Sequence, residues 1–208
     1  MKNYEIFENN IIYSITHNYF PFVYQSVYKQ LGYEKLASRK FTSPEFKIFL
    51  RNNNFLDFVN GIFITRLSNN GLNEIRERLY DPDLNFDDYK SALKKFEKCN
   101  PKKDKKGDFH NASAWSLGTK VLHFYNPEEN PILDSRVREY LDIDDMTYDI
   151  CVNFRVATNG FVKKHKDYFE NFYKSERIKD ELKKRRMTTD FPNMWIMDMA
   201  LYEQSSSV

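Results

Sequence analysis

The chain is poor in the residues that build disulfide-rich and turn-rich folds. Its 208 residues include only 2 cysteines, 6 glycines and 7 prolines. The cysteines, Cys99 and Cys151, are too few for a disulfide scaffold and lack the paired spacing of a zinc site. Because glycine and proline are scarce, a sandwich or barrel with many turns is disfavoured and helices are favoured.

Long apolar runs and an excess of one charge are also missing. No stretch approaches the roughly 18 apolar residues of a membrane span, and the N-terminus does not resemble a signal peptide. The 32 Lys and Arg nearly balance the 30 Asp and Glu, so only a segregated patch would indicate a nucleic-acid partner. With a mean hydropathy of -0.71, the chain is expected to be cytoplasmic, with no membrane partner.

Apolar residues recur at helical spacing along most of the chain, and aromatic residues make up 16% of it. Thr42-Ser43-Pro44-Glu45 predicts a helix start, and Asn52-Asn53-Asn54 predicts a break. The apolar segment 194–202 predicts a helix that docks into the core. These patterns predict one all-α domain over residues 1–208, with the lysine-rich segment 99–112 as a connector between lobes.

Several further boundaries follow from the same signals. Helices are predicted over 11–31, interrupted by Pro21, and Gly71 is predicted to separate the apolar run 55–67 from the next helix. The segment 86–99 is amphipathic, a basic helix is predicted over 174–186, and the end at 205–207 is predicted to be frayed.

One segment, residues 116–141, carries a chemical signal. Gly118-Thr119-Lys120 precedes the apolar residues 121–125, which predicts backbone N–H groups that face an anion at a helix N-terminus. Asp134 lies 14 positions after Lys120 and follows Pro131-Ile132-Leu133, where a helix N-cap is expected. The apolar residues before Asp134 should carry its carboxylate to the edge of the core.

This order of elements resembles the helix-hairpin-helix DNA glycosylase superfamily. Leu117–Val121 looks like the hairpin with the lysine that starts the next helix in the lyase-active branches, and Pro131–Val137 looks like the segment with the essential aspartate. Ser116 stands where the family hairpin has its first glycine, and Trp115 stands where proline is common. No cysteine-rich loop follows Asp134, so no iron–sulfur cofactor is expected.

The resemblance implies two helical lobes with the site between them, and DNA N-glycosylase or lyase activity on a modified or damaged base in double-stranded DNA. Asp134 would stabilise the positive charge that develops on the sugar, and Lys120 would be the nucleophile. Backbone or side-chain contacts to DNA are expected from Ser116, Gly118, Thr119 and Arg136. The lysines at 102, 103, 105 and 106, and those over 174–186, are either backbone-binding patches or a solvated surface.

Each of these residues also has a plain structural interpretation. Asp134 is then an ordinary N-cap, Lys120 a solvated surface lysine and Gly118 a turn between packed helices. His123 is expected to be a hydrogen-bonded core histidine, and Asp198 near the C-terminus is a candidate second acid.

Two alternatives to an enzyme stay open. One is a non-catalytic helical module that binds nucleic acid or protein and kept the fold; the other is an unrelated helical interaction protein. The scattered histidines and cysteines predict no metal and no other cofactor. A common groove for Lys120 and Asp134 would favour the glycosylase interpretation.

Overall fold

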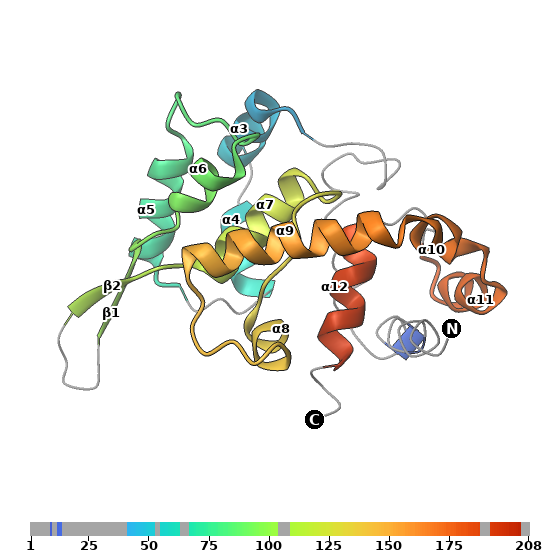
Figure 1. The fold of residues 1–208 in the computed structure, drawn as a ribbon. Coiled ribbons are helices and arrows are strands. Elements are labelled where there is room, and N and C mark those ends of the chain that lie inside the picture. The colour runs from blue at the N-terminus through green and yellow to red at the C-terminus, as the bar shows by residue number, and fades with distance from the viewer. Residues whose placement is uncertain are drawn as a thin grey trace.

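The computed structural model describes residues 9, 12–13, 41–52, 55–62, 67–103, 109–187 and 192–204. The regular secondary structure of this part of the chain is helical except for one short β-hairpin (Figure 1). The elements in chain order are α3 (Ser43–Asn52), α4 (Phe55–Ile62), α5 (Asn69–Leu79), α6 (Tyr89–Lys94), β1 (Asn100–Lys103), β2 (Phe109–Ala112), α7 (Trp115–Tyr125), α8 (Ser135–Tyr140), α9 (Tyr148–Lys164), α10 (Lys166–Asn171), the 3-10 helix η1 (Phe172–Lys174), α11 (Glu176–Lys184) and α12 (Asn193–Gln204). The all-α prediction is confirmed apart from that hairpin.

The β-hairpin lies inside the segment that was predicted to be a connector. Its strands β1 and β2 pair antiparallel, with Asn100 opposite Ala112 and Lys103 opposite Phe109. Two hydrogen bonds continue the pairing toward the helices, from Ala114 N to Phe96 O at 2.8 Å and from Lys98 N to Ser113 Oγ at 3.0 Å. Proline, lysine and asparagine are rare in strands, which explains why the sequence pattern does not predict this pairing.

Helix boundaries follow the capping residues. Thr42 and Glu45 form a reciprocal capping box before α3, in which Thr42 N donates to Glu45 Oε2 at 2.9 Å. At the predicted break α3 ends at Asn52 and α4 begins at Phe55, and positions 53 and 54 lie outside the described residues. Gly71 does not separate two segments as predicted: it lies inside α5, because the hydroxyl of Ser68 accepts from its N–H and starts the helix earlier.

Two other segments are shorter than the sequence pattern predicts. Only Tyr89–Lys94 of the amphipathic segment 86–99 forms a helix, and α11 covers Glu176–Lys184 of the basic segment 174–186. The helices predicted over 11–31 and the frayed end at 205–207 lie outside the described residues, apart from positions 12 and 13.

The core is centred on α7, which packs against α4, α6 and α9. Ten of its residues are buried, from Trp115 to Tyr125 with the exception of Ser116. Its last residue, Tyr125, joins an aromatic cluster with Phe46 and Phe86, whose ring centroids lie 4.9 Å apart. The helix α12 packs against α8 and α9. Its residues from Met194 to Ala200 are all buried, which confirms the prediction that the last helix docks into the core.

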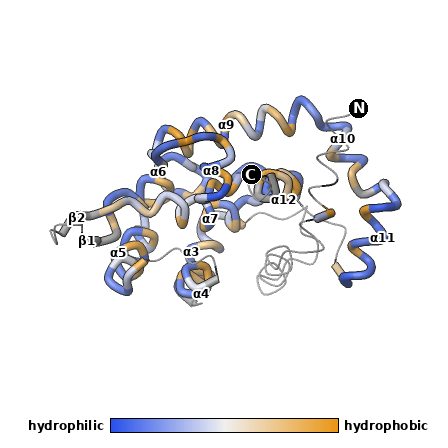
Figure 2. Tube along the Cα trace, turned by 90° about the horizontal axis from the view of Figure 1, so that it is seen from below, coloured by the Kyte–Doolittle hydropathy of each residue, from blue (hydrophilic) through white to orange (hydrophobic). Residues whose placement is uncertain are grey.

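Figure 2 shows the same arrangement by hydropathy, with α10 and α11 at the end of the molecule opposite β1 and β2. Among the described residues, no helix combines the length and the apolar character needed to cross a membrane.

Candidate active site

The motif Gly118-Thr119-Lys120 lies inside α7 and not at its start. The helix begins at Trp115, and the N–H of Gly118 donates to Ala114 O at 2.9 Å as part of the first helical turn. The predicted helix start at Gly118 is therefore wrong, and so is the predicted hairpin over Leu117–Val121. Since its N–H is used within the helix, Gly118 does not offer this group to a phosphate.

Gly118 is instead the point at which α7 approaches α6. A Cβ atom at this position would lie 3.0 Å from Leu93 Cδ1 and 3.0 Å from two ring atoms of Phe96. Such distances are shorter than ordinary van der Waals contacts, so the missing side chain lets the two helices pack closely. The plain interpretation of Gly118 as a turn between packed helices is also wrong, because Gly118 lies within α7.

The opposite face of α7 carries four polar residues. Ser116, Thr119, Lys120 and His123 follow the helical spacing of three and four positions, so they form one stripe. All of them except the half-buried Ser116 are buried. The helix therefore has an apolar face and a polar face, and both are covered.

Lys120 is the centre of this stripe. Its side chain is only 2% exposed, and its Nζ donates to Ser116 Oγ at 2.7 Å. Burial lowers the pKa of the Lys120 amine, while the charges of Asp134 and Asp198 oppose that shift. The prediction that Lys120 is a solvated surface lysine is wrong.

Asp134 is the N-cap of α8, and its Oδ1 accepts from Val137 N at 3.0 Å. The structure thus confirms the predicted cap at the edge of the core, where Asp134 is half-buried. Its charge acts on both Lys120 and Asp198, so the three groups belong to one electrostatic cluster. Asp134 therefore both caps α8 and acts on the charge of Lys120.

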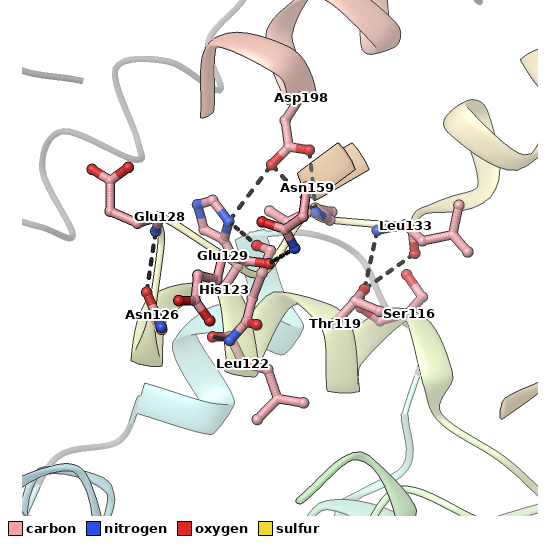
Figure 3. A network of polar contacts seen from close by, with 12 residues as sticks. Ser116, Thr119, Leu122, His123, Asn126, Glu128, Glu129, Leu133, Asn159 and Asp198 are labelled. Carbon is pink, nitrogen blue, oxygen red and sulfur yellow. Dashed lines mark hydrogen bonds and ion pairs between the residues drawn. The ribbon is translucent and has the colours of Figure 1, made fainter. Parts of the chain in front are cut away.

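Thr119 connects α7 to the segment that leads to Asp134. Its Oγ1 accepts from Leu133 N at 3.2 Å and lies 3.2 Å from Leu133 O (Figure 3). The hydroxyl is therefore engaged within the protein, and the prediction that Thr119 contacts DNA is corrected to this internal role.

Asp198 enters the cluster from α12. Its two carboxylate oxygens lie 3.2 and 3.3 Å from the N–H of Ile132, which donates to them (Figure 3). Burial raises the pKa of Asp198 well above its usual range, and the charge of Asp134 adds to the shift, whereas the Ile132 hydrogen bond and Lys120 oppose it. The predicted second acid thus lies with Lys120 and Asp134 in one cluster.

His123 is the hydrogen-bonded core histidine that the sequence predicts. Its Nδ1 lies 2.7 Å from Asn130 O and 3.6 Å from Asp198 Oδ2. Burial lowers the pKa of His123 to about 4, against the effect of the Asn130 hydrogen bond. The ring is neutral at pH 7, so its contact with Asp198 is not an ion pair.

Residues of the turn before Ile132 are held by α9, a link that no sequence pattern indicates. Arg155 Nε donates to Asn130 Oδ1 at 2.8 Å, and Asn159 Nδ2 donates to Glu129 O at 2.7 Å. Beside them, burial raises the pKa of Glu128 to about 7, against a hydrogen bond from the N–H of Asn193 at the start of α12.

The remaining predicted contacts lie on the surface. Arg136 is exposed on α8. Lys102 and Lys103 belong to β1, which projects from the body of the molecule away from α12 in Figure 1, and Lys105 and Lys106 lie outside the described residues. The structure therefore does not bring the hairpin lysines to Lys120. Within the ranges that the structure describes, no three His, Cys, Asp or Glu side chains are grouped to hold a metal ion.

The cluster combines a buried amine whose pKa is lowered with two carboxyl groups in different environments, a combination that amine and carboxyl chemistry requires. Comparison of the chain with protein-family models, with curated protein sequences and with solved structures finds no match.

Proposed function

We propose that the protein is an enzyme of the DNA glycosylase type, in which Lys120 and Asp134 act on the bond between a modified or damaged base and its sugar. The substrate class comes from the resemblance of Pro131–Val137 to the aspartate segment of the helix-hairpin-helix glycosylases, with Lys120 14 positions before Asp134. The observation that carries the proposal is the burial of the Lys120 amine beside Asp134 and Asp198.

A buried lysine is unusual unless it is paired or used in chemistry. Nucleophilic attack needs the neutral amine, and burial lowers the pKa of Lys120 in that direction. Asp198, which has a raised pKa, is placed to hold a proton in the same cluster, whereas Asp134 at the half-exposed edge supplies the negative charge.

In the proposed reaction the bond between C1′ and the base breaks, and its electron pair leaves with the base, which takes up a proton. Asp134 stabilises the positive charge on the sugar. The Lys120 nitrogen then bonds C1′ and loses its protons to water or a carboxylate. The ring oxygen leaves C1′ with its electron pair and is protonated, so that an imine remains.

The sugar would enter where the cluster meets the surface. Ser116, which accepts the Lys120 hydrogen bond, and Asp134 are both half-buried, so the amine is one side chain away from solvent. The proposal retains two helical lobes with this site between them. It also retains Ser116, Arg136 and the lysines at 102, 103, 105 and 106 as contacts to DNA, whereas the hairpin and the roles of Gly118 and Thr119 are given up.

The test is borohydride trapping on duplexes that carry an abasic site or oxidised, alkylated, deaminated or hypermodified bases. The wild type should form a protein–DNA adduct, because borohydride reduces the imine to a stable amine. Lys120→Gln should abolish the adduct, whereas Lys94→Gln, which changes an exposed lysine of α6, should leave it unchanged. Asp134→Asn should lower turnover by roughly a hundredfold or more, because the amide has no charge to offer, and Asn keeps the cap.

The main alternative is the non-catalytic binding module. DNA binding without an adduct or cleavage on any duplex would favour it and would contradict the proposed activity. Equal turnover of the wild type and Asp134→Asn would show that another carboxyl group does the work.

A further inference from the structure

The charge of the chain is segregated, although its net value is small. Residues 163–186 hold ten of the 32 Lys and Arg but only five of the 30 Asp and Glu, so the rest of the chain is net negative. All ten of these cationic residues are exposed. They belong to the end of α9, to α10, η1 and α11, and to the turn that follows, and Figure 2 shows α11 mostly in the hydrophilic colours.

Ion pairs within the helices use only part of this charge. Lys166 pairs with Glu170, Lys179 with Glu176 and Lys184 with Glu181. The segment holds seven further Lys and Arg but only two further carboxylates, Asp167 and Asp180. Its own acidic residues therefore leave the surface with an excess of positive charge.

The helices that carry these cationic residues pack through buried apolar side chains. Phe169, Phe172, Ile178 and Leu182 are buried under α10, η1 and α11, so the opposite side of each helix faces solvent. This places the cationic side chains on an ordered surface and not on a loose tail.

Arg186, just beyond the end of α11, has a backbone conformation that favours glycine. Met187 N donates to Leu182 O at 2.9 Å and Arg186 N donates to Lys183 O at 3.0 Å, the two bonds of a Schellman ending. Arg186 adopts a φ of 54°, which glycine accepts without strain and which other residues rarely adopt. Interaction with the helix dipole accounts for cations in the last turn but not for one placed beyond it in this conformation.

We infer that the surface formed by residues 163–186 binds the phosphate backbone of nucleic acid. This rests on the proposed function and names the docking surface for its DNA substrate. A surface that inserts into a membrane interface needs exposed apolar side chains among the cations. Among the side chains described between 163 and 187, none of the large apolar ones is exposed, so a polyphosphate backbone fits this surface better than a lipid bilayer. The surface lies at the opposite end of α9 from the lysine-rich β-hairpin (Figure 1).

The chain offers two matched triple variants. Lys183→Gln, Lys184→Gln and Arg186→Asn remove three charges from α11 and its ending, the last at a φ of 54°. Lys90→Gln, Lys94→Gln and Lys98→Asn remove three exposed charges from α6 and the turn after it, the last at a φ of 46°. Both sets change the net charge equally and both place Asn, which tolerates a positive φ, at the strained position.

The experiment measures fluorescence anisotropy of a labelled DNA duplex titrated with each protein between about 50 and about 200 mM salt. The α11 variant should bind at least about tenfold more weakly at the lower salt, with the slope of log affinity against log salt reduced by about 2 to 3, because each lost phosphate contact removes about 0.9. The α6 variant should change the affinity less than about twofold. Circular dichroism confirms that both variants fold.

Equal weakening by both variants, or none by either, would overturn the inference, as would loss of binding to phosphatidylserine vesicles with DNA affinity retained. Borohydride trapping separates this inference from the proposed function. Trapping by the wild type with unchanged DNA affinity in the α11 variant would reject the surface alone. Weakened DNA affinity without any adduct would reject the activity alone.

Discussion

The two faces of α7 are both buried, yet they are built on opposite principles. On one face Gly118 omits a side chain so that Leu93 and Phe96 of the α6 segment pack closely. On the other face Lys120 and His123 are covered, with Asp198 of α12 beside His123, and polar groups satisfy one another. The apolar face depends on shape, whereas the polar face depends on hydrogen bonds and protonation. The two faces should therefore respond to different perturbations.

The largest effect is expected from the polar face. Asp198→Ala leaves the N–H of Ile132 without its acceptor and removes one of the two carboxyl groups that act on the Lys120 amine, and should lower the free energy of unfolding by about 3 kcal/mol. Asp198→Asn keeps an acceptor for Ile132 and should lose about 1 kcal/mol. Urea denaturation of the two variants measures this difference, and equal losses would show that the hydrogen bond is not the cause.

Acid should act on the polar face through His123. Because its pKa is about 4 in the folded protein, below the ordinary value of 6.5, the unfolded chain binds the proton first as the pH falls. The contribution of the neutral ring is complete above pH 6.5 and is lost as the pH falls toward 4, which amounts to about 3 kcal/mol. Asp198 and Glu128 act in the opposite direction, since their raised pKa values favour the folded state as the pH falls.

The contribution of His123 is isolated by comparing the wild type with His123→Gln. Subtracting the two free energies of unfolding removes the pH dependence that both proteins share. The remaining difference should grow from low pH to neutral pH across this window. A difference that stays constant with pH would mean that His123 is not held neutral by the fold.

The smallest effect is expected from the apolar face, and a second glycine provides the control. Gly160 lies inside α9 with no atom within 4 Å of an added Cβ, so Gly160→Ala should raise the free energy of unfolding by up to about 1 kcal/mol. Gly118→Ala should not gain stability, and Gly118→Val should lose about 2 kcal/mol because the α6–α7 contact is already tight. Chemical denaturation at one pH is sufficient, and a gain at both glycines would show that the helices separate easily.

The sequence predicts those helix boundaries that depend on neighbouring residues. The capping box at Thr42 and the cap at Asp134 each depend on residues within a few positions, and each is where the sequence indicates. The start of α7 has no such local signal, because its N-cap Ala114 makes no side-chain hydrogen bond. The close packing of Gly118 on Leu93 and Phe96 depends on residues far earlier in the chain.

The polar cluster shows the same division between local and distant causes. A short motif singles out Lys120 and Asp134, and the charge of Asp134 opposes the lowering of the Lys120 pKa. The burial of the stripe was not predictable, because Asp198 is 66 residues from its hydrogen-bond partner Ile132 and Arg155 is 25 residues from Asn130. Such pairs depend on how the helices assemble, which periodicity does not reveal.

The irregular segment 130–133 takes its main-chain and side-chain hydrogen bonds from three helices at once: Thr119 of α7, Arg155 of α9 and Asp198 of α12. Opening of this segment would break its hydrogen bonds to all three helices. We therefore expect the segment to belong to the same cooperative folding unit as the core, with an opening free energy that approaches that of global unfolding. The backbone that leads to Asp134 should then be as well protected from opening as a helix, although it has no regular secondary structure.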